Sequence, residues 1–268
     1  MMSIFRYVPA LRRLLYWSLV CSLALTSQIS RAGSPAEFLT LLVSEETDAY
    51  GKVIPLSEQN IQLFRSLSKE MQVQLIVQRY PWKRALEKAY QGEGMIFGIS
   101  PTTERRSKLD FSQVVYTERV HLVTRCQSSF RYETLQDLKS KRIGVVRGTS
   151  YGEAVDQQMG KLFEVEQDTS RLSGRMTKLL QGRMDGFFHY SYLHPIALES
   201  SLNHYYFSEI QGQASQSGKL FCVQPKAISS VDIHFAIRND INQGRLHKLD
   251  AALMKLRQSD AFQKMFSQ

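Results

Sequence analysis

The chain has 268 residues, of which 43% are hydrophobic and 10% aromatic, so the composition excludes a disordered protein and predicts a sizeable core. It carries 34 Lys and Arg against 25 Asp and Glu, but residues 1–32 hold four of the Arg and no acidic residue, which leaves 30 basic against 25 acidic side chains in residues 33–268. No dense basic stripe remains there, and we expect no nucleic-acid partner. Six scattered His residues lack metal-ligand spacing, so we expect neither a metal site nor a cofactor.

The first 32 residues have the features of a secretory signal peptide. Three Arg residues are followed by an apolar run of 13 residues, which is shorter than the ~20 needed to cross a bilayer. Ser30 and Ala32 then place small residues three and one positions before a cleavage point. A retained membrane anchor is the alternative interpretation. The pattern predicts that the rest of the chain is exported.

Strands and helices alternate in the hydrophobic pattern of residues 39–99. Short apolar or alternating runs predict strands at 39–43, 73–77 and 95–99. Between the first two, apolar residues recur at helical spacing from 63 to 71. A second helix is predicted to begin at Pro81 and to end at Gly92. This alternation indicates an α/β protein.

The same alternation continues to the end of the chain. Further strands are predicted at 120–123, 142–146, 184–188, 220–223 and 231–237. Further helices are predicted at 135–138, from Ser150 to about Phe163, at 176–180, at 246–256 and at 261–266. No flexible linker separates the two halves, which favours two lobes joined by strands over two independent domains.

Three sequence blocks resemble bacterial extracellular solute-binding proteins of family 3, the polar amino-acid type. They are I-S-P-T-T-E-R at 99–105, L-Q-D-L-K to R-I-G-V-V-R-G-T-S at 135–150, and L-Q-G-R-M-D-G at 180–186. The spacing of six residues from Arg105 to Phe111 gives Arg105, rather than Arg106, the family's Arg position. Val115 departs from the Pro that is usual there. The order and spacing of the blocks carry the resemblance over residues 36–266.

The resemblance implies an α/β, two-lobed periplasmic binding protein fold (type II), in which two crossing strands join the lobes near 120–126 and 229–237. The domains expected on that basis are a signal peptide at 1–32, the first part of lobe 1 at 33–125, lobe 2 at 126–229 and the second part of lobe 1 at 230–268. Cys126 and Cys222 lie near the two crossings. They either form a disulfide or remain two small buried thiols, and the sequence leaves both states open.

Several residues are candidates for ligand binding. Arg105 follows a strand and a Ser/Thr-rich turn, where a guanidinium can clamp a carboxylate through two parallel hydrogen bonds, although an ordinary surface Arg has the same pattern. Ser100 and Thr102 offer hydroxyls beside it. Thr149 and Ser150 stand where a strand is expected to enter a helix N-terminus, which makes either an anion site or a plain N-cap.

The resemblance adds further candidates and one departure. Trp82 is expected either to line the cleft or to pack in the core of its helix, and Tyr50 and Glu45 lie in the loop after the first strand. Tyr190 stands where amino-acid binders of the family carry an Asp that holds the ligand's α-amino group. The ligand is therefore not expected to be an ordinary α-amino acid unless Glu45 compensates.

The function implied is a periplasmic solute-binding protein without catalysis, which captures a small carboxylate-bearing ligand, an amino acid or a related compound, between its lobes for an ABC transporter. The expected partner is the transporter's permease, and the expected state is a monomer. Two alternatives stay open. One is a cyclohexadienyl dehydratase-like enzyme on the same fold, whose general acid would come from Glu45, Glu46 or Glu104. The other is a sensory protein whose ligand site has drifted.

Overall fold

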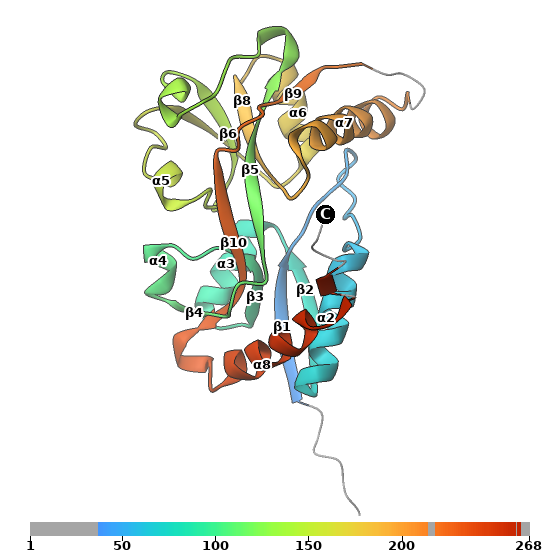
Figure 1. Cartoon of the computed structure of the whole chain (residues 1–268), viewed down its shortest axis with the longest axis vertical. Helices are drawn as coiled ribbons and strands as arrows, with labels where there is room; N and C mark the ends of the chain where they lie inside the picture. Colours follow the sequence, from blue (N-terminus) through green and yellow to red (C-terminus); the bar gives the residue numbers. More distant parts are fainter. Residues whose placement is uncertain (1–36, 214–217, 261, 264–268) are drawn as a thin grey trace, which may run out of the picture. The chain divides into compact units, whose positions relative to one another are not determined.

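Residues 37–213, 218–260 and 262–263 are described by the computed structural model and lie within one unit of the chain, residues 37–268 (Figure 1). The predicted signal peptide lies outside the described residues, and so does most of the predicted helix at 261–266. Among the residues that are described, no helix is both long and apolar enough to cross a membrane.

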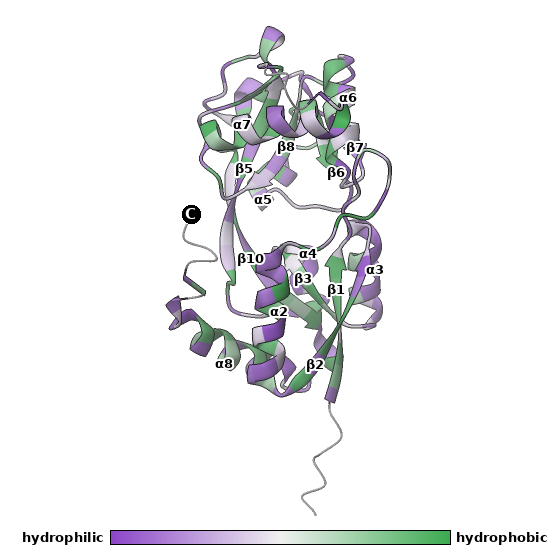
Figure 2. Cartoon of the chain, turned by 90° about the vertical axis from the view of Figure 1, so that its right-hand side faces the viewer, coloured by the Kyte–Doolittle hydropathy of each residue, from purple (hydrophilic) through white to green (hydrophobic). Residues whose placement is uncertain are grey.

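Lobe 1 is built on a sheet of three parallel strands beside one antiparallel strand. Its order is β2 (Val73–Tyr80), β1 (Glu37–Ser44), β3 (Met95–Ile99) and β10 (Ser229–Arg238), and β4 (Leu109–Phe111) pairs with β10. Helices α2 (Glu58–Met71) and α8 (Arg245–Arg257) cover one face, and α3 (Trp82–Gln91) covers the other (Figure 2). Gly92 ends α3 at φ 79°, a left-handed conformation that glycine adopts without a Cβ clash.

Lobe 2 repeats this plan on a second sheet. Its order is β5 (Tyr116–Arg125), β8 (Gly186–Ser191), β6 (Arg142–Val146) and β7 (Glu164–Asp168), and β9 (Phe221–Val223) pairs with β5. Its helices are α5 (Glu153–Asp156), α6 (Leu172–Leu180) and α7 (Pro195–Tyr205), which continues into a π-helical turn, η3 (Tyr206–Ile210). Short 3-10 turns lie at Cys126–Ser128, Leu135–Leu138 and Asn239–Ile241, and a four-residue helix, α4, at Thr103–Arg106.

Strands β5 and β10 join the lobes. They pair antiparallel over five residues, from Ser229 opposite Val120 to Ile233 opposite Tyr116. Beyond this segment β10 pairs with β3 and β4 of lobe 1, and β5 pairs with β8 and β9 of lobe 2 (Figure 1). The predicted two-lobed α/β fold with crossing strands is confirmed. The exact domain boundaries stay predictions.

Alternation along the strands places a hydrophobic layer on each face of each sheet. In β1, Leu41 is fully buried against the α2 and α8 side, and the adjacent Leu42 is fully buried against α3. Lobe 2 has the same arrangement, with Phe188 and its neighbour Phe187 in different clusters. Because successive strand residues point to opposite faces, each pair presents one apolar side chain to each face of its sheet, and helices pack against both faces.

The predicted helix from Ser150 to Phe163 is wrong. Only Glu153–Asp156 is helical, and Gly152 and Gly160 adopt left-handed conformations at φ 100° and 71° that interrupt the pattern. The apolar residues of this segment reach the core of lobe 2 from turns, as Val155 and Phe163 do. The sequence pattern also missed β7 and α7.

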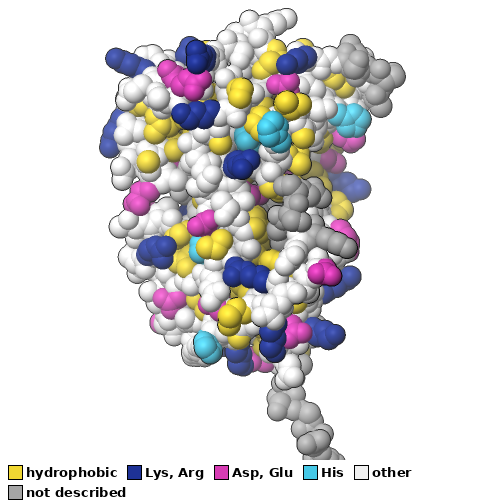
Figure 3. Space-filling model, in the orientation of Figure 1, with side chains coloured by type: hydrophobic (Ala, Val, Ile, Leu, Met, Phe, Trp, Pro, Cys, Tyr) yellow, Lys and Arg dark blue, Asp and Glu magenta, His cyan; other side chains and the backbone are white. Residues whose placement is uncertain are grey.

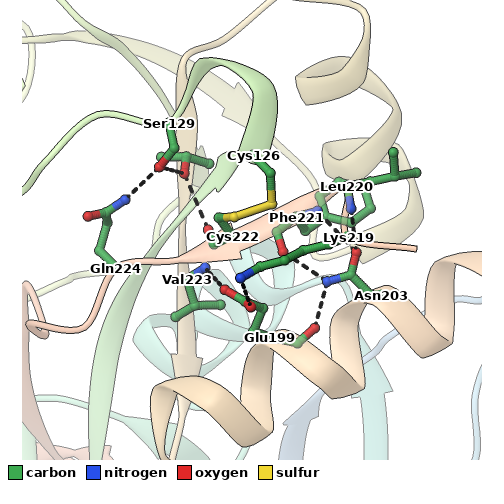
Figure 4. A network of polar contacts seen from close by, with 11 residues as sticks. Cys126, Ser129, Glu199, Asn203, Lys219, Leu220, Phe221, Cys222, Val223 and Gln224 are labelled. Atoms are coloured by element: carbon green, nitrogen blue, oxygen red, sulfur yellow. Dashed lines mark hydrogen bonds and ion pairs between the residues drawn. A yellow bond between two sulfur atoms is a disulfide. The ribbon is translucent and has the colours of Figure 1, made fainter. Parts of the chain in front are cut away.

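Cys126 and Cys222 form a disulfide, with their Cα atoms 5.0 Å apart (Figure 4). The pairing of β9 with β5 positions the bridge, since Cys222 lies opposite Thr124. Asn203 of α7 is buried beside it, where its amide donates to the Phe221 carbonyl and accepts from the Leu220 and Phe221 N–H groups. The bridge and this network attach the β9 segment to the rest of lobe 2.

Candidate functional site

A cavity of about 550 Å³ lies between the lobes. Lobe 1 contributes the ends of β1 and β3, the start of α3 and helix α4, and lobe 2 contributes the end of β6, the loop after it, α6 and β8. The joining strands β5 and β10 form part of the wall. The carboxyl ends of β1, β3 and β6 open into this space, which is where parallel sheets place their ligand sites.

Arg105 reaches the cavity from the turn after β3. Strand β3 ends at Ile99, and Thr102 caps α4 by accepting a hydrogen bond from the Arg105 backbone N–H at 3.1 Å. The cap fixes which of two consecutive arginines points inward. Arg105 is 5% exposed and lines the cavity, whereas Arg106 is exposed, with its guanidinium 5.4 Å from the Phe111 ring.

The Arg105 guanidinium is held by neutral oxygen atoms. Its Nη1 donates to the Ser100 carbonyl at 2.6 Å and to the Ser100 hydroxyl at 3.1 Å, and its Nη2 donates to the Gly148 carbonyl at 3.0 Å. Burial lowers the pKa of Arg105, an effect that the nearby Tyr90 hydroxyl opposes. No ion pair to a carboxylate forms within the described part of the chain. The group thus stays a buried cation that can still receive an anion.

Trp82 both packs in lobe 1 and contacts lobe 2. Its side chain is 8% exposed, belongs to the core cluster under α3 and also lines the cavity. Its Nε1 donates to the Gly148 carbonyl at 2.9 Å, the same oxygen that accepts from Arg105, whose guanidinium lies 6.0 Å from the indole ring. Both possibilities that the sequence left open for Trp82 therefore hold together.

Other hydrogen bonds join the lobes around the cavity. The Ser170 hydroxyl donates to the Glu45 carbonyl at 2.8 Å, and the Thr103 hydroxyl donates to Glu153 at 2.6 Å. Together with the two bonds to Gly148, they hold the lobes close on more than one side. These hydrogen bonds hold the molecule in a closed arrangement, in which both lobes line one cavity.

The loop after β6 contributes hydroxyl groups. Thr149 and Ser150 line the cavity, and the buried Ser150 hydroxyl donates to the Asp156 carboxylate. Gly152, not Ser150, is the N-cap of α5, so the N-cap role considered for Ser150 is wrong. Tyr190 also lines the cavity, donates to the Ser150 carbonyl and stacks on Tyr151 at 5.4 Å.

Three predicted site residues lie outside the cavity wall. Tyr50 is 86% exposed, in a turn that the Asp48 carboxylate closes. Glu45 contributes its backbone carbonyl to the contact with Ser170 rather than its side chain to the cavity. Thr102 acts as the cap described above. A role for these three in binding the ligand stays a prediction.

The wall also contains charged residues that the sequence analysis did not place there. Glu118 faces the cavity from β5, and Arg175 from α6, while Arg79 lies at the end of β2. Nothing in the local sequence distinguishes Arg175 from other arginines on helices. Glu118 offered a weak signal, because it is a charged residue two positions before the buried run 120–124 of the joining strand β5.

Two titratable groups in the wall have strongly shifted pKa values. Burial, and then the nearby Glu46, raise the pKa of Glu118 from 4.5 to about 7. Burial, followed by Arg175 and His121, lowers the pKa of His189 to about 3. At neutral pH His189 is therefore uncharged and Glu118 is only partly ionised. Among the described residues, no group of His, Cys, Asp or Glu side chains has the arrangement of a metal site.

Comparison with known proteins identifies the fold and the family. The family model of bacterial extracellular solute-binding proteins, family 3, matches residues 59–268. Solved structures with the same fold include an amino acid ABC transporter substrate-binding protein from Streptococcus pneumoniae bound to L-arginine, with a TM-score of 0.64 at 18% identity, covering 86% of this chain and 93% of that one. A Salmonella typhimurium periplasmic binding protein with arginine specificity has a TM-score of 0.62 at 20% identity, covering 86% and 97%.

Curated relatives match over shorter segments. The arginine-binding extracellular protein ArtP of Bacillus subtilis is 27% identical over 133 residues, which are 47% of this chain and 49% of that protein. The ABC transporter arginine-binding protein 1 of Escherichia coli is 26% identical over 131 residues, 48% of this chain and 52% of that protein. The matched segments thus span about half the length of these relatives.

Proposed function

We propose that the chain, which belongs to the bacterial extracellular solute-binding proteins of family 3, captures a small carboxylate-bearing solute between its two lobes and delivers it to an ABC transporter. The relatives named above are arginine-binding and ABC transporter proteins, which supports a solute of the amino-acid type or a related compound. The chain acts by binding alone, as a monomer, and its partner is the transporter's permease.

One observation carries this proposal. Arg105 is a buried guanidinium in the wall of the cavity between the lobes, and its contacts are to neutral oxygens rather than to a protein carboxylate. A ligand carboxylate that replaced the Gly148 carbonyl at Nη2 would gain a charged hydrogen bond in a site shielded from water. The ligand's other contacts would come from polar and aromatic residues that line the same cavity, which are Ser100, Thr149, Ser150, Trp82 and Tyr190.

Location in the periplasm fits the same function. The Cys126–Cys222 disulfide is typical of oxidising compartments outside the cytoplasm. Acidic and basic side chains are interspersed on the face shown in Figure 3, which gives no extended basic surface for nucleic acid there. We infer that the signal peptide directs export and that residues 33–268 work in the periplasm.

The proposal is tested by replacing one of two consecutive arginines. Arg105→Ala should weaken binding of the preferred carboxylate by about 30-fold or more, because loss of one partner of a buried charged pair costs about 2–5 kcal/mol. Arg106→Ala is the matched control, since Arg106 is exposed on the same short helix. Calorimetry measures both affinities, and thermal unfolding verifies that both variants fold. Equal affinities of the two variants would contradict the proposal.

Acid-catalysed dehydration, as in cyclohexadienyl dehydratases, is the second candidate function. Its single support is the pKa of about 7 for Glu118 in the cavity wall, a value suited to a general acid. Of the acids considered from sequence, Glu46 lines the cavity, whereas Glu104 is exposed and paired with Lys108. If the protein turns over prephenate and Glu118→Gln abolishes this turnover, the protein is an enzyme. If no turnover is found, binding remains the function.

A further inference from the structure

Arg175 places a second buried guanidinium in the cavity wall, from lobe 2. It lies on α6 and is 5% exposed. Its Nη1 donates to the Phe188 carbonyl at 3.0 Å, and its guanidinium lies 5.2 Å from the Phe187 ring. Its Nε is buried and has no hydrogen-bond partner among the described residues. No carboxylate in the described part of the chain forms an ion pair with it.

A buried arginine of this kind lowers the stability of the fold unless an anion pairs with it. A buried charge loses its hydration, and the fold recovers that loss only through an opposite charge with good hydrogen bonds. Asp168 and Glu46 lie near enough to act on Arg175 through space, yet neither contacts it. Asp168 instead pairs with Lys178, and Glu46 is exposed. The missing partner of Arg175 is therefore expected from outside the chain.

The charges of the whole wall indicate the same kind of partner. Three arginines, Arg79, Arg105 and Arg175, line the cavity together with two acidic residues, Glu46 and Glu118. Glu118 is only partly ionised at neutral pH because burial and Glu46 raise its pKa to about 7. His189, beside Arg175, stays uncharged and adds no positive charge. The wall is thus net positive and matches a ligand with net negative charge.

We propose that the ligand is a small dicarboxylate, with one carboxylate at Arg105 and the other at Arg175. This inference rests on the proposed function and names its ligand class. Because Arg105 belongs to lobe 1 and Arg175 to lobe 2, a ligand with two acidic groups contacts both lobes and favours the closed arrangement. L-arginine, the ligand in the relatives' names, would instead bring a cation to a wall that already holds three.

Matched pairs of ligands test the second carboxylate directly. L-glutamate and L-glutamine differ in one acidic group, as do glutarate and glutaramate, and only the first pair carries an amino group. Calorimetry on the purified protein should give a preference for the diacid of about 10- to 100-fold in at least one pair, as expected for a charged hydrogen bond of ~1.5–3 kcal/mol. The pair that shows the preference tells whether the ligand has an amino group.

Variants of Arg175 then locate the preference. Arg175→Met should reduce the preference for the diacid over its monoamide to less than about threefold. Arg175→Lys keeps the charge but loses the planar guanidinium, so it should reduce this preference only partly. Arg142→Met is the control, because Arg142 is an exposed arginine of lobe 2 that pairs with Glu164 outside the cavity. Its preference should equal that of the wild type. If Arg175→Met does not fold, Arg175→Lys and the wild-type preference decide.

Three results would overturn the inference. The wild type could bind the monoamides as tightly as the diacids, it could bind L-arginine more tightly than either diacid, or folded Arg175→Met could keep the full preference. In each case the proposed function would still stand if Arg105→Ala weakened binding of the ligand that is found. Absence of binding to every carboxylate tested would contradict both proposals.

Discussion

The two lobes hold their buried arginines in different ways. In lobe 1, Arg105 donates to two oxygens of Ser100 within the turn that the Thr102 cap closes, and it also donates to the Gly148 carbonyl of lobe 2. In lobe 2, Arg175 has one carbonyl acceptor and an unpaired Nε. Arg105 is thus positioned by its own turn and by lobe 2, whereas the unpaired Nε of Arg175 leaves hydrogen-bonding capacity for a ligand. Lobe 2 also carries the Cys126–Cys222 disulfide.

The largest effect on stability is expected from removing that disulfide. The bridge closes a loop with a sequence separation of 96 residues, so the double variant Cys126→Ala/Cys222→Ala should lose about 2–5 kcal/mol of unfolding free energy in urea. Hydrogen exchange should show the loss in β9 and α7 before it appears in α2 of lobe 1. Equal loss of protection in both lobes would contradict the contrast drawn between them. As a control, the unfolded, unreduced protein without its signal peptide should show no free thiol.

A smaller effect is expected from Glu118 on the joining strand. The pKa of Glu118 is about 7 in the folded protein, above the ordinary value of 4.5. Between pH 4.5 and pH 7 the folded protein therefore keeps a proton on Glu118 that the unfolded chain has released. The stabilising contribution of Glu118 is present below pH 4.5 and is lost as the pH rises to 7. Glu118→Gln should therefore raise the unfolding free energy at pH 8 by at most about 3 kcal/mol, with little change at pH 4. Urea unfolding at both pH values measures this, and a variant less stable at pH 8 would contradict it.

His189 provides the opposite control for the same experiment. Its folded pKa of about 3 lies below the ordinary 6.5, so its contribution to stability is present above pH 6.5 and is lost as the pH falls toward 3. His189→Gln should make unfolding less sensitive to acid in that range. The two variants should thus change the pH dependence of stability in opposite directions, and the same direction for both would show that the pKa shifts are misassigned.

The residues predicted for the lobe 1 wall of the cavity are close together in the sequence, for a physical reason. Arg105, Ser100 and Thr102 lie within six residues, and the strand, turn and cap that orient them are local, so a short motif describes them. The contacts of Trp82 and Arg105 with Gly148 depend on how the lobes meet. No short motif contains information on how the two lobes meet. The sequence pattern therefore predicted Trp82 and Arg105 as candidates, but it did not predict that both donate to the Gly148 carbonyl.

The lobe 2 wall depends on long-range packing. Arg175 lies on the buried face of α6, where periodicity predicts an apolar side chain, and it lines the cavity from there. Glycines with left-handed conformations shortened the helix expected after Ser150. Helical spacing alone does not reveal such backbone conformations, and so the predicted helix N-terminus near Thr149 and Ser150 gave way to a loop.

The emission of Trp82 tests the central claim, that the ligand binds between the lobes. Residues 33–268 contain no other Trp, and its indole donates to Gly148 of the opposite lobe across the cavity. As L-glutamate or glutarate saturates the protein, the emission should shift or change in intensity with the Kd that calorimetry gives, and Arg105→Ala should show no such change at the same concentrations. Binding detected by calorimetry with an unchanged Trp82 emission would contradict the account.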